Sequence, residues 1–150
     1  MTPIEEPRLR PSTREDLPFV VSLHHTTLKE YIAPIWGWDE DKWNQIITKW
    51  FKPERVEIIC HGSAEIGVLV VEVKPDEFFF ESISIVPSLQ GRGLGSRIIK
   101  EIILKASEKK LPIRLDVLKT NERAQKLYSR LGFRTIAVTD SHFKMEKLDT

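Results

Sequence analysis

Glu81 to Lys100 read ESISIVPSLQGRGLGSRIIK, and this stretch decides the fold of the chain. Its first part, from Ser82 to Val86, suits a β-strand, and Pro87 would end the hydrogen-bonding ladder of that strand. From Leu94 onward, apolar residues recur with the period of a helix. The stretch therefore predicts a strand, a glycine-rich turn and an amphipathic helix, in that order.

The predicted turn contains Gly91, Gly93 and Gly95. Residues without a Cβ can turn sharply and expose their backbone N–H groups. The opening turn of the helix adds unpaired N–H donors and the positive end of the helix dipole. We therefore expect this turn to bind a phosphate or diphosphate, the alternative being a plain tight turn between strand and helix.

Two common phosphate-binding motifs do not fit this turn. A Walker loop needs Gly-Lys followed by Ser or Thr, and the chain has no such sequence. A dinucleotide fingerprint that begins at Gly91 needs its third glycine where the chain has Ser96. Both departures weaken the interpretation of the chain as a nucleotide-binding module.

The residues that remain, Gln90-Gly91-Arg92-Gly93-Leu94-Gly95, resemble the Q/R-x-x-G-x-G/A signature of the GNAT superfamily of N-acetyltransferases. In that family the loop holds the diphosphate of acetyl-CoA, so the resemblance implies this cofactor. Residues 121–133, NERAQKLYSRLGF, look like a second family segment, N-x-x-A-x-x-x-Y-x-x-x-G-F. The resemblance implies that Asn121 hydrogen-bonds the pantetheine arm and that Tyr128 lies near the thioester sulfur. The two motifs together are more specific than either one alone.

The rest of the chain predicts elements in the order found in this family. In the N-terminal part we expect a short strand at 8–10, a helix after Asp16 that Pro34 ends, an aromatic loop at 34–38, and a helix that Asp39 caps and that buries Trp43, Ile46, Ile47 and Trp50. Three antiparallel strands are expected next, at 56–60, 65–73 and 77–86, followed by the glycine turn and a helix to about 109. The last elements expected are a parallel strand at 112–118, a helix from 121, and strands at 134–138 and 142–148. The resemblance therefore covers about residues 8–148. It implies a single α+β (mixed α/β) domain over residues 1–150 with the GNAT acyl-CoA N-acyltransferase fold: a central, mostly antiparallel twisted sheet with helices on both faces.

Composition narrows the classes of function. The formal net charge of +1 gives no field for general nucleic-acid binding. Cys60 is the single cysteine, so an internal disulfide is impossible. Met1 to Pro7 is expected to be a loose leader without the apolar run of a signal peptide, and the apolar stretch at 66–71 is too short to span a membrane. We expect a cytoplasmic protein without a membrane partner.

Acetyl transfer to an amine needs a deprotonated amine, a stabilised carbonyl oxygen and a proton for the departing thiolate. Tyr128 is the candidate proton donor, the alternative being a core aromatic on the stripe of Leu127 and Leu131. Glu81 is the candidate base, acting directly or through water. Its alternative is a carboxylate that reaches solvent near the end of a sheet, and some family members use water chains instead.

The resemblance also implies the residues that contact the cofactor. Backbone groups of the strand before the turn would pair with the pantetheine arm, and the turn would hold the diphosphate. Arg92 would touch a phosphate or remain a solvated charge, and Ser96 would add a hydroxyl donor or simply begin the helix. The full candidate set is Ile83, Ile85, Val86, Gln90, Gly91, Arg92, Gly93, Leu94, Gly95, Ser96 and Asn121.

The acceptor end is only weakly marked in the sequence. Tyr31, Trp36 and Trp38 are candidates for the wall of an acceptor pocket, with the acidic residues at 39–41 drawing an ammonium group. The alternative is core aromatics beside acids that favour the start of a helix. All four histidines are expected to be structural or on the surface, Cys60 is expected to be a buried apolar residue, and no metal site is expected.

Together these observations predict an N-acetyltransferase that moves the acetyl group of acetyl-CoA to a primary amine by direct attack in a ternary complex. The amine belongs to a small metabolite, an aminoglycoside-like compound, a polyamine, or a protein N-terminus or lysine. The alternative is a non-catalytic acyl-CoA-binding sensor or regulatory module, which would keep the glycine turn and Asn121 without using Tyr128 and Glu81. Dimers are common in the family, so a homodimer is possible.

Overall fold

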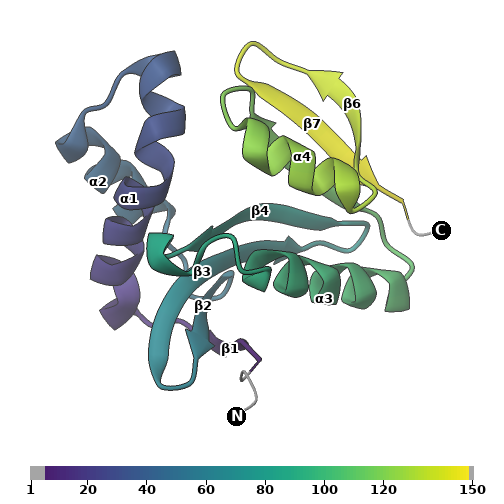
Figure 1. The fold of residues 1–150 in the computed structure, drawn as a ribbon, viewed down its shortest axis with the longest axis horizontal. Coiled ribbons are helices and arrows are strands. Elements are labelled where there is room, and N and C mark those ends of the chain that lie inside the picture. The colour runs from purple at the N-terminus through teal and green to yellow at the C-terminus, as the bar shows by residue number, and fades with distance from the viewer. Residues whose placement is uncertain (1–5, 149–150) are drawn as a thin grey trace. The chain divides into compact units, whose positions relative to one another are not determined.

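The computed structural model describes residues 6–148, and most of the expected leader lies outside them (Figure 1). The elements in chain order are β1 (Arg8–Pro11), the 3-10 helix η1 (Arg14–Asp16), α1 (Leu17–Trp36), α2 (Glu40–Trp50), β2 (Val56–His61), β3 (Ala64–Val73), β4 (Phe78–Ile85), the 3-10 helix η2 (Pro87–Leu89), α3 (Leu94–Glu108), β5 (Ile113–Leu118), α4 (Glu122–Arg130), β6 (Arg134–Val138) and β7 (His142–Lys147). The seven strands form one sheet in the order β1-β2-β3-β4-β5-β7-β6. Strands β4 and β5 pair in parallel, whereas the β1–β2, β2–β3, β5–β7 and β6–β7 pairs are antiparallel. The predicted mixed class with a mostly antiparallel sheet is confirmed.

The chain divides into two compact units. The first contains Met1–Lys29, Trp38–Val70 and Ser82–Gly95, and the second contains Glu30–Gly37, Val71–Glu81 and Ser96–Thr150. The chain passes from one unit to the other within α1, β3, β4 and α3.

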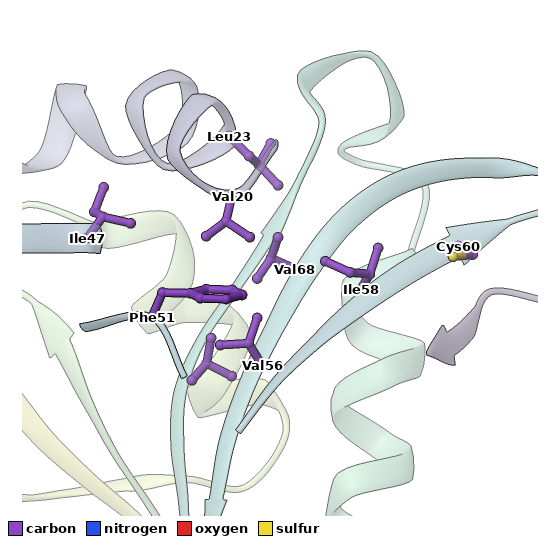
Figure 2. Packing of buried hydrophobic residues seen from close by; sticks show 9 residues of the cluster. Val20, Leu23, Ile47, Phe51, Val56, Ile58, Cys60 and Val68 are labelled. Atoms are coloured by element: carbon purple, nitrogen blue, oxygen red, sulfur yellow. The ribbon is translucent and has the colours of Figure 1, made fainter. Parts of the chain in front are cut away.

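The first unit has an aliphatic core between its helices and strands. Val20 and Leu23 come from α1, where their spacing of three puts them on one helical face. The ring of Phe51, at the end of α2, lies in the same cluster, and Figure 2 shows it among side chains of α1, β2 and β3. Since Phe51 is 1% exposed, its truncation to alanine would cost about 3–5 kcal/mol of folding free energy.

The second unit is built on β5 and α4. Ile113, Leu115 and Val117 alternate along β5 and are buried, as the period of a strand requires. Helix α4 begins at Asn121, whose side chain accepts a hydrogen bond from the N–H of Ala124 over 3.1 Å. Gly132, at φ 99°, turns the chain after this helix. The predicted ends of α4 are therefore confirmed.

Three local predictions in the N-terminal part are wrong. Pro34 does not end α1, which continues to Trp36 and ends before Gly37 at φ 72°. Proline removes one intrahelical hydrogen bond, and the single turn beyond it is still closed by the Gly37 N–H and the Ala33 carbonyl. Trp36 is therefore helical and does not belong to an aromatic loop. Ile46 is 40% exposed rather than buried.

Asp16 differs from its prediction in a subtler way. It lies immediately before α1, but its carboxylate accepts hydrogen bonds from the backbone N–H of Thr13 and from the Arg10 guanidinium. The Arg10 guanidinium, which outweighs the opposing effect of burial, holds the pKa of Asp16 below its usual range. The side chain therefore fastens the entry into α1 to β1.

Candidate functional site

The β4–α3 loop, residues 86–93, is the first part of the candidate site. Gly91 and Gly93 have φ angles of 77° and 81°, a left-handed conformation that L side chains rarely adopt. Gly93 stands directly before α3, so no side chain caps the helix from that position, and the first turn carries no acidic residue. A Cβ placed on Gly93 would meet no atom within 4 Å, so the space beside it is open. A loop of this form fits a diphosphate at the positive end of α3.

Gln90 holds this loop to the strand that precedes it. Its side-chain Nε2 donates a hydrogen bond to the carbonyl of Ile85 over 2.8 Å. Backbone hydrogen bonds from Leu89 to Val86 and from Gln90 to Pro87 close the intervening 3-10 turn. The side chain of Gln90 therefore has a structural role, which the motif alone does not reveal.

The backbone groups of the candidate residues in and after β4 point to different edges of the strand. The N–H of Val86 donates to the carbonyl of Ile66 in β3 over 2.8 Å. Because backbone groups alternate between the two edges of a strand, those of Ile83 and Ile85 face the other edge. Pairing of β4 with β5 ends at Phe80 and Leu115 in the described chain. The edge at Ile83 and Ile85 is thus the one suited to an added, extended ligand, and the N–H of Val86 is already used.

Gly67 is a site-shaping residue that the sequence did not mark. A Cβ at this position would lie 2.4 Å from the carbonyl oxygen of Ser84 in β4. Glycine therefore permits β3 to approach β4 at the level of Ser84. Only its place within an apolar run could have signalled this role.

Tyr128 is buried in an aromatic cluster of the second unit. Its ring centroid lies 5.9 Å from that of Phe80 and 5.8 Å from that of Phe133, both in edge-to-face geometry. Burial raises the pKa of its hydroxyl well above the ordinary value of 10. The phenol therefore stays protonated at neutral pH and can donate a proton or a hydrogen bond. The position of Tyr128 is therefore compatible both with a purely structural core aromatic and with a proton donor.

Glu81 and Asn121 also lie in the second unit. Glu81 is half-buried in β4, directly after Phe80, and its Oε2 atom is shielded from solvent. The Oδ1 atom of Asn121 accepts the N–H of Ala124, and its NH2 group donates to no other residue of the described chain. That NH2 group is therefore the part of Asn121 that can serve a ligand.

The structure separates the three aromatic acceptor candidates. Trp38 belongs to the first unit, where it stacks on Trp43 at 5.8 Å and meets the His25 ring at 5.1 Å. Tyr31 and Trp36 belong to the second unit. Trp38 therefore belongs to a different compact unit from the other two candidates.

Two of the three acidic residues at 39–41 have partners in the first unit. Asp39 accepts a hydrogen bond from the N–H of Lys42 over 3.1 Å as the cap of α2, and Glu40 pairs with His25 over 3.1 Å.

Within residues 6–148, no group of three or more His, Cys, Asp or Glu residues is arranged to hold a metal ion. A helix both long and apolar enough to cross a membrane is likewise not found in that range.

Comparison with known proteins adds independent information. The family model described as an acetyltransferase (GNAT) domain matches residues 52–135, more than half of the chain, including the β4–α3 loop and α4. The chain is 40% identical over 60 residues to thialysine N-epsilon-acetyltransferase from Bos taurus. That match spans 39% of this chain and 35% of the bovine protein, so only about a third of the relative is covered.

Solved structures resemble nearly the whole chain. The PaiA N-acetyltransferase of Thermoplasma acidophilum, solved in complex with coenzyme A, has a TM-score of 0.77 at 18% identity and covers 96% of this chain and 99% of its own. The ribosomal-protein-S18-alanine N-acetyltransferase of Escherichia coli has a TM-score of 0.63 at 20% identity, covering 96% and 94%. At these identities the likeness concerns the fold.

Proposed function

The chain belongs to the GNAT acetyltransferase family, and we propose that it transfers the acetyl group of acetyl-CoA to a primary amine by direct attack in a ternary complex. The observation that carries this proposal is the β4–α3 loop, with left-handed Gly91 and Gly93 before an α3 terminus that has no acid in its first turn. We further propose that residues 1–150 act as one acetyltransferase domain.

The local geometry supports the cofactor contacts that the family resemblance implies. The backbone N–H groups of 91–96 bind the diphosphate, with Arg92 as an exposed counter-charge. The backbone groups of Ile83 and the N–H of Ile85 pair with the amides of the pantetheine arm, because the carbonyl of Ile85 already accepts a hydrogen bond from Gln90. The NH2 group of Asn121 donates a hydrogen bond to the same arm. Tyr128 follows Asn121 by about 10 Å along α4, which suits two contacts with one extended arm.

The proposed chemistry removes two protons from the amine nitrogen and delivers one to the departing sulfur. Glu81 accepts a proton from the ammonium group of the acceptor, directly or through water, because only the free amine attacks the thioester. The amine nitrogen then bonds to the acetyl carbon, and the bond from that carbon to sulfur breaks. Tyr128 donates its phenolic proton to the departing thiolate. The new amide nitrogen releases its second proton to solvent, and the Tyr128 phenolate regains a proton from there. Burial keeps the phenol protonated at neutral pH, so a donor is in place when the thiolate forms, but the raised pKa also makes it a weaker acid.

One experiment tests the proposal directly. The protein is mixed with acetyl-CoA and a panel of primary amines, and thiol release is followed together with the mass of the product. The expected result is amine-dependent thiol release with a mass gain of one acetyl group. If calorimetry shows tight binding of acetyl-CoA but no amine is turned over and no acetylated product forms, the result would instead favour the acyl-CoA sensor.

The sensor alternative is favoured by one specific observation. Tyr128 is 7% exposed and packs edge-on against two phenylalanines, as a purely structural aromatic would. A sensor would bind acetyl-CoA through the same loop and release it unchanged. The two functions can be distinguished by measuring how much acetyl-CoA remains after long incubation with the protein and the amine panel. An enzyme consumes acetyl-CoA, whereas a sensor leaves it intact.

A further inference from the structure

The end of α1 meets the β6–β7 turn in the second unit. The indole of Trp36 lies 6.1 Å from the imidazole of His142, with their planes inclined by 42°. Trp36 is 55% exposed, so about half of its surface is open to solvent. Nearby in α1, the carbonyl of Tyr31 accepts a hydrogen bond from Thr120 Oγ1 over 2.6 Å, which fastens this part of α1 to the segment after β5.

His142 is held in one orientation. Ser141 Oγ and His142 Nδ1 share a hydrogen bond of 2.7 Å. When Nδ1 carries the proton, Nε2 is an acceptor, and when it does not, Nε2 is a donor. Among the described residues Nε2 has no hydrogen-bond partner. The pair Trp36 and His142 therefore offers a planar apolar surface beside one polar atom that is available to a ligand.

We propose that Trp36 and His142 recognise the acceptor of the acetyltransferase, and that they select primary amines carrying a planar aromatic group. This inference rests on the proposed function and names its substrate class. An aromatic ring stacks on the exposed indole, and Nε2 of His142 hydrogen-bonds a polar group of the same acceptor.

The charges around this pair argue against a polycationic acceptor. Lys119 lies 5.8 Å from the ring of Phe143, the neighbour of His142. Burial raises the pKa of the Tyr31 hydroxyl, the Glu30 carboxylate raises it further and Arg123 opposes them, so both charged groups lie near Tyr31. With exposed Asp140 in the turn, this region of the second unit carries two cations and two carboxylates. The surface thus lacks the excess negative charge that a polyamine requires.

Kinetics with phenethylamine and spermidine test the proposal at saturating acetyl-CoA. The wild-type protein should prefer phenethylamine in kcat/KM by at least about tenfold. Trp36→Ala and His142→Gln should each raise the KM for phenethylamine by about tenfold without changing the affinity for CoA. Trp36→Phe, which keeps an aromatic ring, should have a KM for phenethylamine close to that of the wild type. His61→Gln, a histidine of β2 in the other unit, is the matched control and should leave both amines unaffected.

A binding measurement makes the test independent of turnover. Imidazole NMR signals of the CoA-loaded protein are assigned by their loss in His142→Gln and His61→Gln, and each amine is then titrated. Phenethylamine should shift the His142 signals and leave those of His61 in place. A preference for spermidine, or an unshifted His142 signal, would overturn the proposal. Failure of CoA to bind in calorimetry would instead reject the proposed function, and the titration without CoA would still report on His142.

Discussion

The side-chain amide of Gln90 donates a hydrogen bond to the carbonyl of Ile85 across 2.8 Å, joining the β4–α3 loop to the strand from which it leaves. Two parts of the proposed cofactor site are thereby coupled, because Ile85 lies on the strand edge and Gln90 begins the glycine turn. A change at Gln90 should therefore disturb the orientation of both.

Gln90→Ala should weaken CoA binding by about tenfold, since loss of one neutral hydrogen bond costs about 1 kcal/mol and the loop also loses its fixed orientation. Gln90→Glu should weaken it further, because a carboxylate cannot donate to Ile85 and repels the diphosphate. Calorimetry with CoA measures both effects. Gln45→Ala, an exposed glutamine of α2, is the control, and equal affinities in all four proteins would contradict this role.

Gly93→Glu should abolish detectable CoA binding while the protein still folds. The open space beside Gly93 can accept a side chain, so the cost to stability is mainly the left-handed backbone, about 1–2 kcal/mol. The added carboxylate, however, occupies the position expected for the diphosphate. Gly62→Glu is the matched control, because Gly62 has a similar φ of 60° in the β2–β3 turn. Calorimetry should show CoA binding retained in the control, and retention in folded Gly93→Glu would disprove the assignment of the loop.

The sequence was sufficient for the parts of the fold that local chemistry determines. The glycine turn, the Asn121 cap and the Gly132 stop each depend on residue types with few alternatives, and their positions were predicted correctly. Pro34 was misjudged because the cost of one lost hydrogen bond so near the end of α1 is small compared with continuing the helix. Ile46 was misjudged because the apolar stripe of α2 is narrower than its sequence suggests.

Contacts between distant segments could not be predicted from the sequence. His142 was expected to be structural or on the surface, and nothing near it in the chain indicates that Trp36 lies against it. Similarly, the close approach of β3 to Ser84 explains Gly67 only once the strands are paired. The roles of Glu81 and Tyr128 remain predictions that depend on catalysis being measured.

Tyr128→Phe should lower kcat by about 10²-fold and leave the affinity for CoA nearly unchanged. The substitution removes the proposed proton donor but keeps the ring that packs against Phe80 and Phe133. Steady-state kinetics with an accepted amine and calorimetry with CoA measure the two quantities. Phe79→Leu, which changes the half-buried aromatic next to Phe80 in β4, controls for altered packing in that strand. Turnover of Tyr128→Phe at the wild-type rate would show that the hydroxyl has no catalytic role.

His24 should make the folded protein less stable in mild acid. Its ring is 6% exposed and packs edge-on against Trp50 at 5.3 Å, and burial lowers its pKa from 6.5 to about 4, with His25 adding to the effect. As the pH falls below 6.5, His24 becomes protonated in the unfolded chain but stays neutral in the folded chain. The free energy of unfolding therefore decreases down to about pH 4 and then levels off.

The contribution of His24 can be isolated by comparing the wild type with His24→Phe, which keeps an aromatic ring but cannot titrate. Between pH 7 and pH 4.5 the wild type should lose about 2 kcal/mol more unfolding free energy than the variant. Urea denaturation at both pH values measures this difference, and carboxylates that titrate in the same range cancel because both proteins share them. Since the linkage depends only on the buried ring, equal losses in the two proteins would mean that His24 accepts its proton without unfolding.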